Sequence, residues 1–141
     1  MKYDIKAKWL EALSSDEYEQ TSGCLFDTSL DHNYDQSKKM CCLGVLTDLY
    51  IKAHPKDSWI NKEIDGAKRN APSFSSPEDY SSPTNEAYYL HPFVSEWSGV
   101  EEKGSLNLEG FSSDLSSMND SSYRDGISDY SYVIPIISEF L

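Results

Sequence analysis

Apolar residues recur at helical spacing between residues 42 and 53, where the sequence is CLGVLTDLYIKA. The apolar positions follow the i, i+3, i+4, i+7 pattern of a helix with one buried face: Cys42, Leu43, Leu46, Leu49, Tyr50 and Ala53. Pro55 stops the pattern after His54. Gly44 costs roughly 1 kcal/mol relative to alanine inside a helix, so we expect another backbone to approach closely there. This helix is predicted to form the centre of the core.

Three further segments show helical periodicity or helix-boundary residues. Tyr3–Leu13 places Ile5 and Trp9 on one face, as an amphipathic helix does. A short helix is predicted to open at His91-Pro92 and to close at Gly99. The last helix, 131–141, carries an apolar stripe made of Val133, Ile136, Ile137 and Phe140.

The remaining apolar runs are short and predict strands. The predicted strands are residues 24–26 and residues 85–90. The segment 101–117 mixes apolar residues with glycine and serine, which predicts short strands joined by turns. Residues 71–83, APSFSSPEDYSSP, are rich in proline and serine without periodicity, which predicts a mobile loop. We therefore expect an α+β fold in which residues 1–141 form a single compact domain, with about four helices packed on a small antiparallel sheet.

Composition narrows the class of protein. A length of 141 residues suits one domain, and 13% aromatic residues argue against disorder although only 38% of residues are hydrophobic. No apolar run approaches the ~20 residues that a membrane span needs, and the first residues lack the apolar stretch of a signal peptide. Three cysteines, two of them adjacent, favour reduced thiols over a disulfide framework. These features predict a cytoplasmic protein without membrane contact.

The net charge of −12 is concentrated in the second half of the chain. Residues 1–70 carry ten Lys or Arg against twelve Asp or Glu, whereas residues 71–141 carry two against twelve. Binding to nucleic acid needs a basic footprint, so direct nucleic-acid binding is not expected. An acidic half favours solubility, and it could also face a basic protein surface, including one that normally holds DNA.

The order of motifs resembles a group of small proteins encoded by tailed phages and prophages, most of them uncharacterised. The blocks are KWLEALSSDEYEQTSGCL, CCLGVLTDLY, LHPFVSEWSGV and LSSMND, followed by an apolar C-terminal helix. The resemblance covers about half of the chain, and CCLGVL is its most specific part. It implies a phage accessory role and one α+β domain, and together with the predicted cytoplasmic location it places the protein in the host cytoplasm. The chain departs from the pattern at Thr47, in the serine-rich 71–83 segment and in the acidic 120–130 segment.

A cysteine nucleophile is one candidate chemistry. Cys41 precedes the central helix, where the helix dipole and free N–H groups can lower a thiol pKa. His32, His54 or His91 would have to act as the base of a hydrolase or transferase. Cysteine is, however, among the most buried residue types, and none of the histidines lies in a motif that marks a base. We therefore expect no enzymatic activity.

A metal site is a second candidate. Cys24, Cys41 and Cys42 could supply thiolate ligands together with the histidines. Adjacent cysteines do not form the C-x2-C chelate that structural zinc sites use. No metal and no cofactor are therefore expected.

A ligand pocket is the third candidate. Aromatic and amide side chains in the recognisable blocks suit a planar, polar ligand such as a nucleotide base, and nearby cations would hold its phosphates. The candidate ligand-binding residues are Tyr18, Gln20, Trp97, Asn119, Lys38 and Arg69. The alternative is structural, because amides often serve turns and caps and tryptophan often fills the core.

The sequence thus predicts a phage-type counter-defence protein that acts by binding. Its favoured partner is a small nucleotide-derived immune signal, which it would sequester. The alternative is that its acidic surface occludes a basic, DNA-binding surface of a host defence protein. A cysteine-dependent hydrolase is the third alternative. The sequence leaves open whether the protein forms a homo-oligomer.

Overall fold

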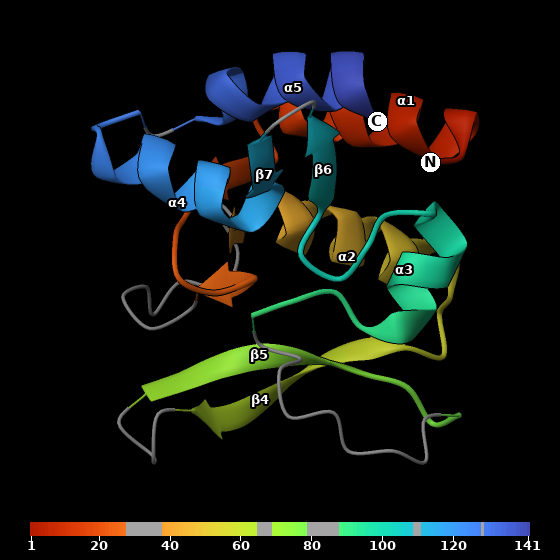
Figure 1. Ribbon diagram of the computed structural model, residues 1–141. Coiled ribbons are helices and arrows are strands. Elements are labelled where there is room, and N and C mark those ends of the chain that lie inside the picture. Colours follow the sequence, from red (N-terminus) through yellow and green to blue (C-terminus); the bar gives the residue numbers. More distant parts are fainter. Residues whose placement is uncertain (28–37, 65–68, 79–87, 109–110, 128) are drawn as a thin grey trace.

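The centre of the fold is α2 (Cys42–Ala53), the helix that the apolar pattern predicts (Figure 1). The computed structural model describes residues 1–27, 38–64, 69–78, 88–108, 111–127 and 129–141. The other elements are α1 (Tyr3–Leu13), β1 (Tyr18–Gln20), β2 (Phe26–Asp27), β3 (Lys38–Met40), β4 (Ser58–Ile64), β5 (Arg69–Ser75), α3 (Pro92–Ser98), β6 (Ser105–Leu108), β7 (Phe111–Asp114), α4 (Leu115–Arg124), η1 (Tyr130–Tyr132) and α5 (Val133–Phe140). The predicted single α+β domain is confirmed.

The elements form layers around α2. Helix α1 packs against both α2 and α5, so the two ends of the chain lie side by side at the top of Figure 1. The β4–β5 hairpin lies at the opposite end of the molecule, and α3 lies beside α2 between the two. In the described part of the chain, no helix has the length and apolar character needed to cross a bilayer.

Helix α2 is buried along most of its length because other backbones pack closely on it. The Cys41 thiol accepts a hydrogen bond from Gly44 N at 3.4 Å, which caps the start of the helix. A Cβ added at Gly44 would lie 1.9 Å from the main-chain oxygen of Leu25. The predicted close approach at Gly44 is therefore confirmed, and the approaching backbone is the segment that leads into β2.

The strands of the described residues form three separate sheets rather than one small antiparallel sheet. The first has the order β1-β3-β2, and its β1–β3 pair is parallel. The other two are the antiparallel hairpins β4–β5 and β6–β7. Strand patterns do not indicate which strands pair, and most strands here have only two to four residues, so the division into sheets could not be predicted.

The predicted mobile loop at 71–83 is wrong for its first part. Residues 71–75 belong to β5, which pairs with β4 in register, with Pro72 opposite Asn61. Proline lacks an N–H donor and is tolerated here because each strand of this two-stranded sheet has a free edge. Residues 79–83 lie outside the described residues, and so do 85–87 of the predicted strand 85–90.

Helix α4 contains Asn119 and was not predicted from the apolar pattern. The helix begins where the Asp114 carboxylate accepts a hydrogen bond from Ser117 N at 2.8 Å. Its sequence, LSSMNDSSYR, is mostly polar, so it carries no broad apolar stripe. The buried residues are Leu115, Asn119 and Ser122, and the core-facing side of the helix is thus partly polar.

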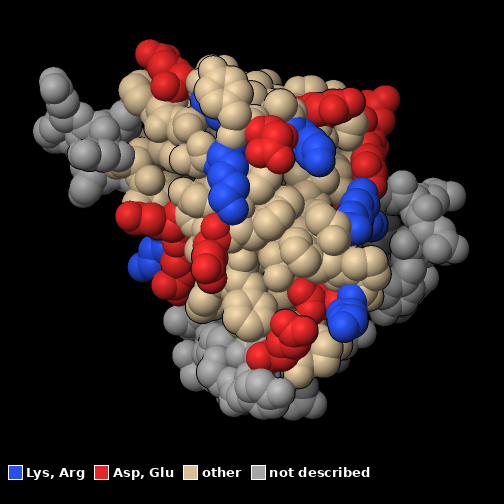
Figure 2. Space-filling model, turned by 90° about the vertical axis from the view of Figure 1, so that its right-hand side faces the viewer, with Lys and Arg blue, Asp and Glu red and all other residues tan. Residues whose placement is uncertain are grey.

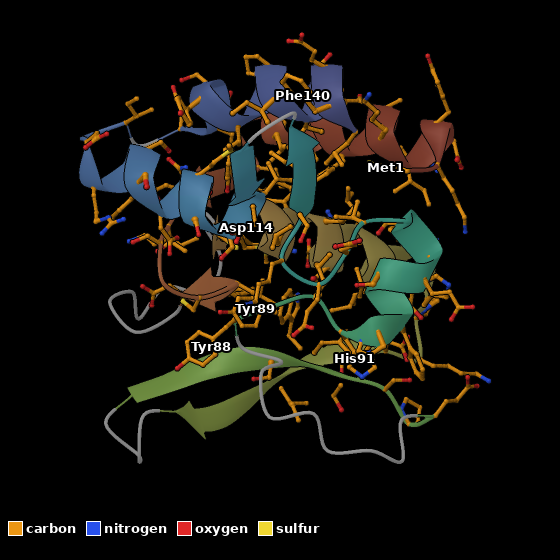
Figure 3. The ribbon with its side chains drawn as sticks, viewed as in Figure 1. Met1, Tyr88, Tyr89, His91, Asp114 and Phe140 are labelled. Carbon is orange, nitrogen blue, oxygen red and sulfur yellow. The ribbon has the colours of Figure 1, made fainter. Side chains whose placement is uncertain are left out.

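The predicted boundaries of α3 are confirmed. The ring nitrogen of His91 accepts a hydrogen bond from Phe93 N at 3.1 Å, and Gly99 ends the helix with φ = 77°. His91 itself is buried between α3 and β5, where its ring packs 4.6 Å from that of Phe74 (Figure 3). The predicted stripe on the last helix is only partly correct, because Phe140 is 49% exposed.

Candidate functional site

The structure separates the predicted ligand-binding residues into three places. Gln20 and Asn119 lie together in the interior, Tyr18 and Lys38 meet at the carboxylate of Asp48, and Trp97 lines a surface pocket elsewhere. The sixth residue, Arg69, begins β5, and its side chain lies outside the described set.

Asn119 is fully buried and joins three distant segments. Its Oδ1 accepts a hydrogen bond from Cys42 N at 3.2 Å, and its Nδ2 donates to Thr21 O at 2.8 Å. The Cys42 N–H belongs to the first turn of α2, where backbone donors have no partner within the helix. Asn119 therefore satisfies the start of α2 from a helix 77 positions along the chain.

The amide of Gln20 completes this buried network. One end lies 2.8 and 2.7 Å from the main-chain oxygens of Ile127 and Asp129, and the other lies 3.1 Å from Ser122 Oγ and 3.0 Å from Asn119 Oδ1. Carbonyl oxygens only accept, so the nitrogen belongs beside the two main-chain oxygens. Ser122 Oγ then donates to the amide oxygen. Both predicted amides thus bind the chain itself, as the structural alternative holds.

Asp48 is the centre of a second polar cluster, which the sequence analysis did not identify. Its carboxylate is 3% exposed and accepts hydrogen bonds from Tyr18 Oη at 2.7 Å, Lys38 Nζ at 3.0 Å and Trp59 Nε1 at 3.0 Å. Lys52 Nζ lies 3.6 Å from the same carboxylate and also contacts Glu17. The cluster ties β1, β3 and β4 to the middle of α2.

The electrostatics of this cluster favour the ionised carboxylate. Burial by itself would raise the pKa of Asp48, but the hydrogen bonds from Tyr18, Trp59 and Lys38 outweigh burial and hold the pKa below its usual value. Burial raises the pKa of the Tyr18 phenol well above its usual value, so the phenol stays a donor. Lys38 is thus engaged by a buried carboxylate, which weakens its case as a phosphate-binding cation.

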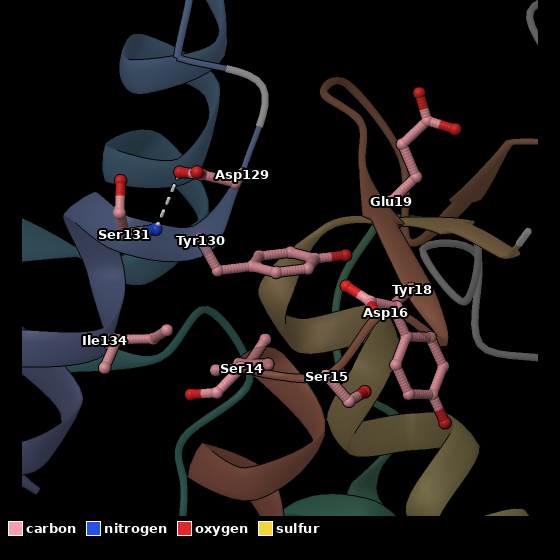
Figure 4. A pocket seen from close by; sticks show the side chains of 10 residues that line it. Ser14, Ser15, Asp16, Tyr18, Glu19, Asp129, Tyr130, Ser131 and Ile134 are labelled. Carbon is pink, nitrogen blue, oxygen red and sulfur yellow. Dashed lines mark hydrogen bonds between the residues drawn. The ribbon is translucent and has the colours of Figure 1, made fainter.

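An acidic cavity of about 500 Å³ opens between the end of α1, β1 and η1 (Figure 4). Asp16 and Glu19 lie on the β1 side, and Asp129 lies on the η1 side with a carboxylate oxygen that accepts from Ser131 N at 3.0 Å. The full lining is Leu13, Ser14, Ser15, Asp16, Tyr18, Glu19, Asp129, Tyr130, Ser131 and Ile134. Among these described residues there is no Lys, Arg or His, so the cavity suits a cation better than a phosphate.

A second, shallower pocket of about 370 Å³ contains Trp97, the third predicted site. The rings of Tyr50 and His54 stack 3.9 Å apart at 17°. The Trp97 ring stands nearly perpendicular to both, 5.4 Å from Tyr50 and 6.0 Å from His54. Because these two distances are similar, Trp97 lies beside the stack rather than on top of it.

Charged side chains of both signs surround this aromatic pocket. Its lining includes Glu78, Glu96 and Lys2, all of them exposed, together with Phe93. Figure 2 shows the side of the molecule that carries the N-terminus and α3, where uncharged side chains form a continuous area with acidic and basic groups around it. The pocket therefore offers flat aromatic surface and accessible carboxylates in one place.

The thiols are buried. Cys41 is 4% exposed, and burial raises the pKa of its thiol to about 12. Burial also raises the pKa of Cys42 well above its usual value. A thiol with a raised pKa is a poor nucleophile, so the surroundings of Cys41 and Cys42 do not favour covalent catalysis. Within the described ranges, no three His, Cys, Asp or Glu side chains are grouped so that they could hold a metal ion.

The fold and these sites define the class of the protein: a single-domain α+β protein whose two larger described cavities are lined by acidic and aromatic side chains. The chain belongs to the family described as Domain of unknown function (DUF8296), which it matches over residues 1–139. No curated protein and no solved structure matches it.

Sequence reasoning missed Asp48, the Tyr50–His54 pair and the carboxylates of both cavities. A signal for Asp48 was present, because an acidic residue inside a strongly apolar helix needs a buried partner. A signal for the Tyr50–His54 stack was present as well, since residues four apart are neighbours on a helix. The acidic cavity had no local signal, because its walls come from opposite ends of the chain.

Proposed function

We propose that this protein acts by binding a basic protein surface, which agrees with the counter-defence role predicted above and with the phage accessory role that the resemblance implies. The observation that carries the proposal is the acidic cavity, which Asp16, Glu19 and Asp129 line together and whose described lining contains no Lys, Arg or His. A cluster of carboxylates attracts Lys and Arg side chains and speeds association with a positively charged partner. The net charge of −12 adds a general attraction between the whole protein and a positively charged partner.

Sequestration of a nucleotide-derived signal stays a prediction, and the geometry supports it less. A nucleotide ligand would bring phosphates, which need cations or free N–H groups. Lys38 already binds Asp48, and Gln20 and Asn119 bind the chain itself. The candidate residues do not converge on one cavity.

The proposal can be tested with purified bacterial defence and restriction proteins that bind DNA. Fluorescence anisotropy of a labelled DNA duplex reports whether this protein releases the duplex from each of them. We expect release that weakens as salt increases, because screening shortens the reach of charges. The triple variant Asp16→Asn, Glu19→Gln, Asp129→Asn should release DNA less effectively, since each exposed charge pair contributes roughly 1.5- to 5-fold in affinity.

A matched triple variant provides the control. Asp4→Asn, Glu11→Gln and Glu139→Gln remove the same charge from exposed positions outside the cavity lining. If both triple variants behave alike, net charge rather than the cavity governs binding, and the proposed site is wrong. If no DNA-binding protein is affected, while calorimetry finds a cyclic nucleotide or an ADP-ribose derivative bound at micromolar concentration, the proposed function is wrong.

A further inference from the structure

The aromatic pocket presents π surface at the edge of α2 and α3. Tyr50 lies in the last turn of α2 and His54 directly follows the helix, where their rings stack, and Trp97 reaches them from α3. Tyr50 is 7% exposed, whereas His54 and Trp97 are half-buried. The accessible aromatic surface of the pocket therefore comes from His54, Trp97 and the half-buried Phe93 rather than from Tyr50.

The hydrogen bonding of His54 determines which of its ring nitrogens accepts. His54 Nδ1 lies 2.8 Å from the main-chain oxygen of Tyr50. A carbonyl oxygen only accepts, so Nδ1 carries the proton of the neutral ring. The lone pair is then on Nε2, which makes this nitrogen an acceptor for an N–H donor.

Carboxylates give the pocket a negative electrostatic potential. Glu78 and Glu96 line it from the end of the β5 segment and from α3, and both are exposed. Burial, followed by the nearby carboxylates Asp57, Glu78 and Glu96, raises the pKa of Tyr50 to about 12. Lys2 is the only Lys or Arg among the described lining residues, and it opposes this field in part.

We propose that this pocket binds the guanidinium group of an arginine side chain on the basic partner. A guanidinium is planar and can lie against the Trp97 and His54 rings. Its N–H groups can donate to Glu78, Glu96 and His54 Nε2. The inference rests on the proposed function, because it identifies one anchoring residue of the proposed partner.

Three observations favour arginine over other ligands. A lysine ammonium is a compact, strongly hydrated charge, and this open pocket does not remove its water. A quaternary ammonium has no N–H to donate to the two carboxylates. A nucleobase would stack equally well, but the phosphate attached to it would be repelled by Glu78 and Glu96.

The three tryptophans allow a direct test by NMR. Trp9 Nε1 donates to Cys42 O at 2.9 Å in the core, and Trp59 Nε1 donates to Asp48 at 3.0 Å. Only Trp97 lines the pocket. Titrating the 15N-labelled protein with N-acetyl-arginine-amide at millimolar concentrations should shift the indole signal of Trp97 and leave the other two unchanged. N-acetyl-lysine-amide should shift it less at equal concentration.

Charge variants of the rim should change the affinity in opposite directions. Glu96→Gln should weaken arginine-amide binding roughly 1.5- to 5-fold, and Lys2→Gln should strengthen it by a similar factor. Trp97→Leu should weaken it about 2- to 5-fold through loss of the aromatic face, and Trp97→Phe should retain part of the binding. Glu139→Gln, at an exposed position of α5, should change nothing.

The outcomes separate this inference from the proposed function. If the lysine probe binds as well as the arginine probe, or if Trp97 does not respond, the arginine site is wrong. DNA release that depends on the acidic cavity would then still support the proposed function. If arginine-amide binds as described but no basic protein is bound, the pocket is supported and the proposed function is wrong. An amide spectrum of each variant that matches the wild type confirms folding.

Discussion

The Gln20–Asn119 network and the Trp97 pocket contain the kinds of side chain that sequence reasoning assigned to one ligand site, yet they differ in what surrounds them. Asn119 is fully buried, and its side-chain amide is hydrogen-bonded to the backbone of Cys42 and of Thr21. The Trp97 pocket lies at the surface, and its lining includes Glu78, Glu96 and His54. The first region holds the chain together, and the second can accept a molecule from outside.

The difference shows that residue type does not indicate a binding site until the partners of each polar atom are known. A buried amide whose donors and acceptors are all used contributes to folding, because losing a partner leaves a buried polar group unsatisfied. An exposed carboxylate beside aromatic rings contributes little to folding and remains free for recognition. Mutation should therefore separate stability from binding.

The largest effect is expected for Asn119→Ala. The substitution leaves Cys42 N–H and Thr21 C=O without their partner, at about 1–3 kcal/mol each, so the free energy of unfolding should fall by about 2–6 kcal/mol. Urea denaturation measures the change. Ser117→Ala, at an exposed position of the same helix, is the control and should change stability by less than about 0.5 kcal/mol. A small effect of Asn119→Ala on stability would contradict the structural role and would favour a role of Asn119 in ligand binding.

Leu46→Ala shows how much stability is lost when one apolar core side chain is truncated, and this loss can be compared with that of Asn119→Ala. Leu46 is fully buried in α2, and its truncation should lower the free energy of unfolding by about 2–5 kcal/mol through lost burial and a cavity. The same urea experiment, run beside Asn119→Ala, tests whether one amide network matters as much as one core side chain. An unchanged unfolding midpoint would contradict the central position of α2.

Alkaline pH should weaken the fold through the buried phenols. The pKa of Tyr18 is raised by burial, and that of Tyr50 is raised to about 12, whereas unfolded tyrosine ionises at about 10. A raised pKa contributes stability below the unfolded value, and this contribution is lost as pH rises from about 10 through the folded values. Thermal unfolding measured from pH 8 to pH 11 should show this loss. Tyr18→Phe should make the loss smaller, and an identical profile for the variant would contradict the assignment.

The smallest effect on stability is expected at the pocket rim. Glu96→Gln and Lys2→Gln change exposed charges, so each should alter the free energy of unfolding by less than about 0.5 kcal/mol. Their effects on arginine-amide binding should nevertheless have opposite signs. Calorimetric unfolding and NMR titration of the same samples make the comparison. A rim substitution that unfolds the protein would show that the two regions are not distinct.

The helices with strong apolar periodicity were predictable because that signal is local. In α1 every third or fourth residue enters the core, and in α2 every residue from Cys42 to Asp48 is buried, so a window of about twelve residues contains each pattern. Helix α4 was missed because its core-facing side includes Asn119 and Ser122, which are hydrogen-bonded to Cys42, Thr21 and Gln20 outside the helix. Strand β5 was missed because its serine and proline residues resemble a loop until β4 pairs with them.

The sequence by itself determined the central helix, the short helix from His91 to Gly99, the α+β class and the acidic character of the second half. Each of these depends on residues close together in the chain or on composition. Only the tertiary structure decided that Gln20 and Asn119, 99 positions apart, lie in one buried hydrogen-bond network and that Trp97 lies apart from them. It also decided that Asp48 accepts hydrogen bonds from Tyr18 and Lys38. The physical reason is that hydrogen bonds and charge pairs act over a few ångströms in space. Whether a polar side chain is satisfied or free is therefore determined by the segments that folding brings beside it.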